Sequence, residues 1–191
     1  MKKAERIKLF AFDVDGTLTP GYLVMGENGE TSKIFHARDG LAIALAHRMV
    51  YITGFITGRK SPIVEKRGKE LAVDFVLMGV ADKVKAMEGL LKTCGLSWDE
   101  AAYMGDDLND LPLMEKAGFS ACPQDGVKEV QKAADFISSC QGGKGAAREF
   151  IEKVMKTQGR WKEAVDSYRK KQDTVSQEYP QDIMIKFSGK K

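Results

Sequence analysis

Closely spaced carboxylates are the residues of this 191-residue sequence that most clearly could do chemistry. Asp13 and Asp15 are separated by a single residue and are followed by Gly16, which lets a backbone turn sharply and approach a ligand. Two neighbouring carboxylates can hold a divalent cation, or can divide the roles of nucleophile and general acid/base between them. By itself the segment could equally be an ordinary Asp- and Gly-rich turn.

A second acidic segment, Gly105-Asp106-Asp107-Leu108-Asn109-Asp110, lies later in the chain. Its carboxylate and amide oxygens are the ligands that hard cations prefer. Acids also favour the first turn of a helix, so the run has a structural interpretation as well. The presence of both acidic segments in one chain favours a metal site.

Thr57-Gly58-Arg59-Lys60 and Lys83 suggest that the ligand is an anion. A hydroxyl, free backbone N–H groups and an incoming helix N-terminus can hold a phosphoryl oxygen, although Thr57 could simply cap that helix. Lys83 opens a predicted helix, where a positive charge opposes the helix dipole and a nearby anion would offset it. A solvated surface lysine is the alternative.

These four segments follow four apolar, strand-like runs, at residues 7–12, 50–56, 75–78 and 101–104. Weaker strands are expected at 119–122 and 136–137, and patterns with helical spacing lie between the strands. The alternation predicts an α/β fold with a Rossmann-like, doubly wound parallel sheet and helices on both faces. Ligands of such sheets bind at the carboxyl ends of the strands, where these segments would meet.

One interval departs from that alternation. Residues 22–25 and 31–35 are β-prone and flank a turn containing Asn28-Gly29, which predicts a β-hairpin over the carboxyl end of the first strand. Beyond about residue 160 the pattern weakens. We expect a main domain over residues 1–160 and a C-terminal extension over 161–191, helical at first and then mobile or docked on a neighbour.

The bulk composition narrows the class of protein. Apolar residues make up 43% and charged residues 30%, and the net charge is only +3, without the basic field of a nucleic-acid-binding protein. The charged start and the lack of a long apolar run predict neither a signal peptide nor a membrane helix. Three scattered cysteines predict no disulfide framework, so we expect a cytoplasmic protein.

Taken in chain order, DxDGT, TGR, Lys83 and GDDxND resemble the motif set of the haloacid dehalogenase-like phosphatase superfamily. The resemblance implies a phosphatase that works through an aspartyl-phosphate. Asp13 would be the nucleophile and Asp15 the general acid/base. Mg2+ would be held by Asp13, Asp106 and the backbone carbonyl of Asp15. Thr57 and Lys83 would bind the phosphoryl oxygens, with support near the metal from Asp107, Asn109 and Asp110.

The intervals between motifs point to the capless branch. About 40 residues separate Asp15 from Thr57, and about 25 separate Thr57 from Lys83, which leaves no room for a cap domain. Capless relatives commonly cover the site with a neighbouring subunit, so we expect a homo-oligomer, most simply a homotetramer.

Within this branch the sequence resembles the 3-deoxy-D-manno-octulosonate 8-phosphate phosphatases. The shared segments are residues 25–30, 38–40, 58–60 with Arg67, and 142–149. The resemblance implies a sugar-acid phosphate as substrate and a place in lipopolysaccharide biosynthesis. It implies substrate contacts from Asp15, His36, Ala37, Arg38, Asp39, Gly40, Arg59, Arg67 and Lys83, and a loop with Gly143, Lys144 and Arg148 that reaches a neighbour's site. Arginine suits the substrate carboxylate because its planar fork binds it through two hydrogen bonds.

One position departs from that pattern. Ala44 stands where related enzymes often have a further arginine, so a nine-carbon, sialic-acid-type sugar phosphate is an alternative substrate. A phosphotransferase or a phosphatase acting on proteins is a further possibility. A non-catalytic binding module on the same fold is the alternative from another class.

Overall fold

The computed structural model describes residues 2–174. Its centre is a six-stranded parallel sheet in the order β5-β4-β1-β6-β7-β8. These strands are β1 (Leu9–Phe12), β4 (Ile52–Thr57), β5 (Phe75–Met78), β6 (Ala101–Met104), β7 (Phe119–Cys122) and β8 (Phe136–Ile137). The predicted fold class is confirmed. Because β1 pairs with β4 on one side and with β6 on the other, its carboxyl end lies where the strand order reverses.

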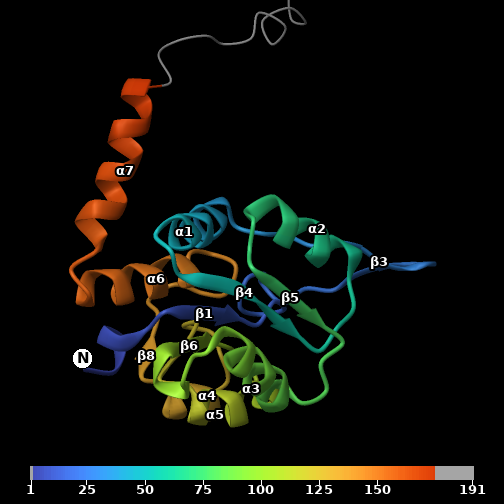
Figure 1. Ribbon diagram of the computed structural model, residues 1–191. Helices are drawn as coiled ribbons and strands as arrows, with labels where there is room; N and C mark the ends of the chain where they lie inside the picture. Colours follow the sequence, from blue (N-terminus) through green and yellow to red (C-terminus); the bar gives the residue numbers. More distant parts are fainter. Residues whose placement is uncertain (1, 175–191) are drawn as a thin grey trace, which may run out of the picture.

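Helices cover both faces of the sheet (Figure 1). On one face lie α1 (Ala37–Arg48), α2 (Pro62–Leu71) and α6 (Ala146–Thr157). On the other lie α3 (Lys83–Cys94), α4 (Leu111–Lys116) and α5 (Lys128–Ala133). Short 3-10 segments, η1 (Lys2–Arg6), η2 (Trp98–Glu100) and η3 (Leu108–Asp110), connect or precede these elements.

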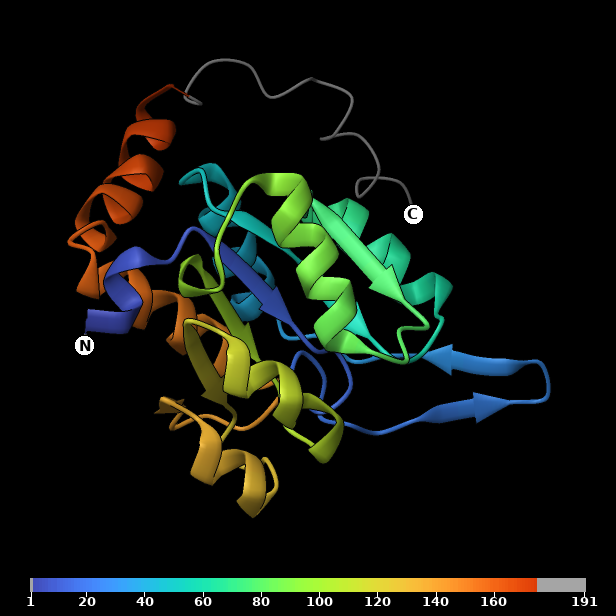
Figure 2. The ribbon, with the colours of Figure 1, turned by 60° about the horizontal axis from the view of Figure 1, so that its bottom comes forward.

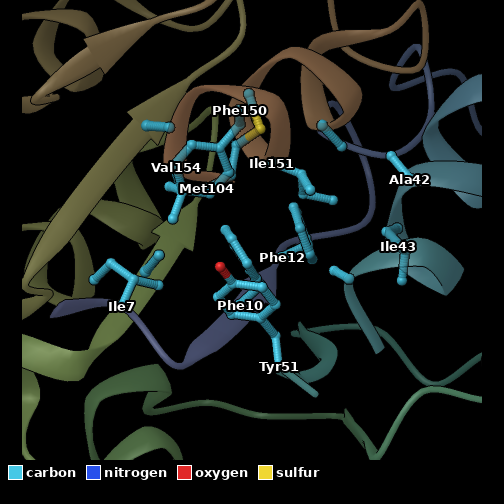
Figure 3. Close-up of a cluster of buried hydrophobic side chains, with 14 of the residues drawn as sticks. Ile7, Phe10, Phe12, Ala42, Ile43, Tyr51, Met104, Phe150, Ile151 and Val154 are labelled. Carbon is cyan, nitrogen blue, oxygen red and sulfur yellow. The ribbon is translucent and has the colours of Figure 1, made fainter. Parts of the chain in front are cut away.

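The alternating side chains of β1 supply both halves of the core. Phe10 and Phe12 point into the cluster under α1 and α6, and Leu9 and Ala11 point into the cluster under α3, α4 and α5. Figure 3 shows the first cluster, in which the ring of Phe150 lies edge-on to that of Phe10, with centroids 5.7 Å apart. Full burial of such rings is worth about 1.5–3 kcal/mol each. The strand that carries Asp13 is therefore anchored from both sides.

The hairpin consists of β2 (Val24–Gly26) and β3 (Gly29–Ser32), which reach outward beyond the sheet (Figure 2). Its turn residues are Glu27 and Asn28, one position earlier than Asn28-Gly29, and Gly29 adopts a positive φ of 107°. The strands cover residues 24–26 and 29–32, rather than the predicted 22–25 and 31–35, and the register shifts between Val24 and Met25. Of the residues in the two strands, all but Gly29 and Glu30 are exposed.

A final helix, α7 (Trp161–Thr174), follows α6. Ala164 is buried, and the ring of Trp161 lies 5.0 Å from the guanidinium carbon of Arg148. The first turns of α7 therefore pack on the main body. Residues 175–191, where a mobile or docked tail was expected, lie outside the described residues. Within residues 2–174, no helix combines the length and the apolar character needed to cross a bilayer.

Candidate active site

Parallel pairing brings three of the four chemical segments to one edge of the sheet. β4, β1 and β6 are adjacent in the sheet. β4 ends at Thr57, β1 ends immediately before Asp13, and β6 ends two residues before Asp106. Lys83 is the first residue of α3, the helix that follows the neighbouring strand β5. Strand ends therefore gather nucleophile, metal and phosphate candidates at the switch point of the sheet.

Lys83 is the hub of a buried ion cluster. Its Nζ lies 2.6 Å from Asp13 Oδ1, 2.6 Å from Asp110 Oδ1 and 3.2 Å from the hydroxyl of Tyr103. Burial alone would lower the pKa of Lys83, but the charges of Asp13 and Asp110 outweigh it and raise that pKa. The ammonium therefore stays charged, which explains a lysine at a helix N-terminus.

Asp110 organises the loop after β6. Its Oδ1 accepts hydrogen bonds from Lys83 and from the Tyr103 hydroxyl, the latter at 2.6 Å. Its Oδ2 accepts from the backbone N–H groups of Asp106 (2.9 Å) and Asp107 (3.2 Å). With both oxygens engaged, Asp110 is suited to support the site rather than to bind a metal.

Asp106 rests directly on the loop that carries Asp13. The Thr17 hydroxyl donates to Asp106 Oδ1 at 2.7 Å. A Cβ atom at Gly16 would lie only 2.0 Å from Asp106 Oδ2, and Gly16 has a φ of +93°. Close approach of the second acidic segment to the first therefore requires glycine here.

Asp13 and Asp106 could share a cation at this edge, with Asp110 beside them. Asp13, Asp106 and Asp110 each offer an oxygen within 4.8 Å of the others. Burial, with the charge of Asp110 as the next cause, raises the pKa of Asp13 to about 7. Burial also raises the pKa of Asp106 to about 7, against the Thr17 hydrogen bond. Crowded, buried acids with oxygen donors fit a hard divalent cation, which would relieve their repulsion.

Asp15 lies beside two cations from other elements. The ammonium of Lys33, in the segment after β3, pairs with Asp15 Oδ1. Arg59 Nε lies 3.8 Å from Asp15 Oδ2. Lys33 also pairs with Glu30 at 2.6 Å, and Glu30 accepts a hydrogen bond from the hydroxyl of Ser61, the N-cap of α2. Thus the hairpin base, the loop after β1 and the loop after β4 are joined at Asp15.

The remaining residues expected at the substrate form a second group between α1 and α2. A small cavity there, of about 10 Å³, is lined in part by His36, Asp39, Gly40 and Arg67. Arg67 pairs with Glu70 at 2.9 Å and lies 5.4 Å from the ring of Phe35. The cavity lining does not include Lys83 or the carboxylates that pair with it.

Asp39 faces the later loop. Its carboxylate accepts backbone hydrogen bonds from Gly145 (3.1 Å) and Arg148 (2.8 Å). Its burial raises the pKa of this carboxyl group, against those hydrogen bonds. Asp39 thus fastens the start of α6 to the start of α1. Its neighbours in the predicted motif, Ala37 and Arg38, are exposed.

The glycine loop before α6 lies on the chain's own site. A Cβ at Gly142 would fall 1.7 Å from the carbonyl oxygen of Gly16, and the N–H of Gly143 donates to Thr17 at 2.9 Å. The side chain of Arg148 pairs with Glu152, whereas Lys144 is exposed. Of the three residues predicted to reach a neighbour, Lys144 is the one that projects into solvent.

The remaining predicted residues differ in exposure. Thr57 is buried at the end of β4, and its hydroxyl accepts from the N–H of Arg59 at 3.4 Å. Asp107 and Asn109 are exposed, and Asp107 caps the N–H of Leu108 at 2.7 Å.

Sequence reasoning missed two contributors, Lys33 and Tyr103. Lys33 lies in a polar segment whose spacing carries no sign of chemistry. Tyr103 lies in a strand of mostly apolar residues. Its hydroxyl has a role because it donates a hydrogen bond to Asp110, which lies beyond the end of that strand. An aromatic hydroxyl one position before the end of a buried strand was the available signal.

Comparisons with known proteins identify relatives of this chain. A family model described as haloacid dehalogenase-like hydrolase matches residues 66–150. The 3-deoxy-D-manno-octulosonate 8-phosphate phosphatase of Escherichia coli (strain K12) is 39% identical over 162 residues, which cover 85% of this chain and 86% of that protein.

Solved structures are similar as well. That of the 3-deoxy-D-manno-octulosonate 8-phosphate phosphatase from Moraxella catarrhalis, in complex with magnesium, phosphate and KDO, has a TM-score of 0.84 at 36% identity and covers 87% of this chain and 96% of its own. The cobalt-bound deoxy-D-mannose-octulosonate 8-phosphate phosphatase from Haemophilus influenzae has a TM-score of 0.80 at 38% identity, with 82% and 92% covered.

Proposed function

Because the chain belongs to the haloacid dehalogenase-like hydrolase family, we propose that it is a magnesium-dependent phosphatase acting on a sugar-acid phosphate, 3-deoxy-D-manno-octulosonate 8-phosphate. The observation that carries the proposal is the buried Asp13, held by Lys83 beside Asp106 at the switch point of the sheet. The likeness to phosphatases of that substrate supports the choice of sugar.

In this proposal Asp13 attacks the phosphorus, and the bond from phosphorus to the sugar oxygen breaks. The Lys83 contact orients the Asp13 carboxylate for that attack. Asp15 donates a proton to the departing sugar oxygen. It then takes a proton from the water that attacks the aspartyl-phosphate, which releases inorganic phosphate and restores Asp13.

The metal site of the proposal consists of Asp13, Asp106 and the backbone carbonyl of Asp15, with Asp110 in support. Among residues 2–174, each of Asp13 and Asp106 accepts one side-chain hydrogen bond, so each retains oxygen capacity for a cation. A bound Mg2+ would offset the negative charge of nucleophile and phosphate as they approach. Relatives have been solved with magnesium and with cobalt, and Mg2+ is the ion we propose here.

The phosphate would bind at the strand ends, and the sugar would bind toward the cavity between α1 and α2. Thr57 and Lys83 would contact the phosphoryl oxygens, and Asp107 and Asn109 would support the metal loop from the rim. The residues around the small cavity, His36 to Gly40 and Arg67, would face the sugar acid together with Arg59. Two arginines suit the carboxylate of such a substrate.

Association into a homotetramer is part of the proposal. The hairpin and the segment beside it expose apolar side chains, with Tyr22 74%, Met25 56% and Ile34 62% accessible. Exposed apolar patches mark interaction sites, and a second copy would cover them and bring Lys144 toward a neighbour's site. Light scattering should give a tetramer, and Met25→Lys should shift it to smaller species. A monomeric wild type would contradict this part.

The proposal also sets a domain boundary near residue 160 and places the protein in the cytoplasm, in the synthesis of lipopolysaccharide sugars. The three free cysteines support a reducing compartment.

The test is phosphate release with Mg2+ from a panel of phosphates: the eight-carbon and nine-carbon sugar acids, hexose phosphates and a phosphopeptide. Asp13→Asn should be inactive, whereas Asp99→Asn, a matched change at an exposed carboxylate, should behave as wild type. A preference for the nine-carbon acid would keep the reaction but change the substrate. An inert wild type, or an active Asp13→Asn, would refute the catalytic assignment.

A further inference from the structure

Lys33 is a charged side chain that the proposed reaction leaves without a role. It follows the hairpin strand β3, and its side chain is only 1% exposed. Burying an ammonium is costly unless it is paired, and its partners are Asp15 and Glu30. Both of its charged contacts are carboxylates, so its influence passes through them.

The two oxygens of Asp15 are in different situations. Oδ1 accepts the hydrogen bond from Lys33. Oδ2 is buried, has no hydrogen-bond partner among the described residues, and lies 3.8 Å from Arg59 Nε. A lone carboxylate can rotate and exchange its oxygens, but a carboxylate gripped at one oxygen presents the other in a fixed direction.

Lys33 is itself held in place by an element outside the hairpin. Glu30 pairs with its ammonium at 2.6 Å and accepts a hydrogen bond from the Ser61 hydroxyl, and the Glu30 side chain is 10% exposed. Ser61 also caps α2 by accepting from the N–H of Val64 at 3.4 Å. The contacts thus connect Ser61, at the N-terminus of α2, through Glu30 and Lys33 to Asp15.

From this geometry we propose that Lys33 is a positioning residue, which holds the Asp15 carboxylate in one orientation for proton transfer. The inference rests on the proposed function. Asp15 gives its proton to the sugar oxygen as the phosphorus–oxygen bond breaks and Asp13 is phosphorylated. The same carboxylate then accepts a proton from the attacking water as the bond between Asp13 and phosphorus breaks. In this way the base of the hairpin takes part in each step.

The experiment compares Lys33→Met with Lys69→Met, a lysine-to-methionine change at a side chain that is 74% exposed on α2. A misplacement of about 1 Å can cost on the order of 100-fold in rate, so we expect Lys33→Met to lower kcat on the sugar-acid phosphate by about 10- to 100-fold. KM should change by less than about 3-fold, because Lys33 does not contact substrate. Lys69→Met should match wild type.

A nitrophenyl phosphate separates positioning from general damage. Its phenolate leaves without needing a proton, so Lys33→Met should still release a rapid burst of nitrophenolate equal to the enzyme concentration. Slow turnover should follow, because water attack still needs Asp15. A structural defect would instead reduce the burst itself.

Glu30→Gln keeps the test decisive if Lys33→Met does not fold. It removes the charge that holds Lys33 and retains an acceptor for Ser61, so the same pattern should appear with a smaller loss of kcat. Wild-type kcat in both variants, or in Glu30→Gln when Lys33→Met is unfolded, would overturn the role of Lys33 alone. An inert wild type would overturn the proposed function and this inference with it.

Discussion

Replacement of Asp110 by asparagine should destabilise the metal-free fold more than any other isosteric change in the acidic segments. Asp110 is fully buried and accepts four hydrogen bonds, from Lys83, Tyr103 and the backbone N–H groups of Asp106 and Asp107. Asparagine retains a single oxygen. Whichever way its amide is turned, the NH2 group faces two donors.

The size of the effect follows from those contacts. A buried donor left unpaired costs about 1–3 kcal/mol, so two such donors cost about 2–6 kcal/mol. Removing the charge of Asp110 also relieves its repulsion of Asp13 and Asp106, which offsets part of the loss. A net loss of about 2–4 kcal/mol, at about 2–4 °C of Tm per kcal/mol for a chain of this size, gives a decrease of about 5–15 °C.

Thermal unfolding in the presence of a chelator, followed by far-UV circular dichroism, would measure the change. The matched control is Asp99→Asn, which removes an exposed pair with Arg6 and should cost less than about 1 kcal/mol. If Asp110→Asn melts as wild type does, Asp110 does not organise the site and the assigned hydrogen-bond network is wrong.

Three further changes test other parts of the site and fold. The pKa values of Asp13 and Asp106 are raised to about 7, so the metal-free fold binds their protons more tightly than the unfolded chain does. The stability of the metal-free fold should therefore fall as pH rises from about 4 to about 7. Titration with Mg2+ should accordingly raise Tm more at pH 8 than at pH 6, and an equal rise at both would contradict the shifts. Gly16→Ala should abolish the Mg2+-induced rise in Tm, because its Cβ would lie 2.0 Å from Asp106 Oδ2, and calorimetry that finds wild-type Mg2+ affinity would refute that close approach. Val50→Gly should raise Tm by about 2–4 °C, since Val50 is 86% exposed and adopts a φ of +65°, a left-handed conformation that costs a β-branched residue about 1 kcal/mol; a lower Tm would show an unrecognised role for its side chain.

The strand ends were predictable because their signals are local. A short apolar run followed by Asp13 or by Gly105-Asp106 identifies both a buried strand and the chemistry after it, and parallel pairing then brings the two together. The start of β4 was predicted less well, because Val50 was assigned to the strand although β4 begins at Ile52. Val50 belongs by composition to the strand that follows, but α1 ends at Arg48 and the chain needs a left-handed residue to turn into β4.

The other contacts depend on where separate elements come to lie. Lys33 meets Asp15 across 18 positions of sequence, and Ser61 meets Glu30 across 31. No periodicity encodes such pairings, because they depend on the direction in which the hairpin leaves the sheet. Asp39 illustrates the same limit, since its carboxylate is engaged by backbone groups more than 100 positions away.

Direct detection of a phosphoryl group on Asp13 is the measurement that addresses the central claim. Wild-type protein and Asp15→Asn would be mixed with Mg2+ and a nitrophenyl phosphate, whose phenolate leaves without a proton from Asp15, then quenched in acid and mapped by peptide mass spectrometry. Asp15→Asn should accumulate the phosphoryl group on the peptide that contains Asp13, because water attack lacks its base. Turnover by wild type with no phosphorylated peptide in either protein, or with the phosphoryl group on another residue, would contradict the account.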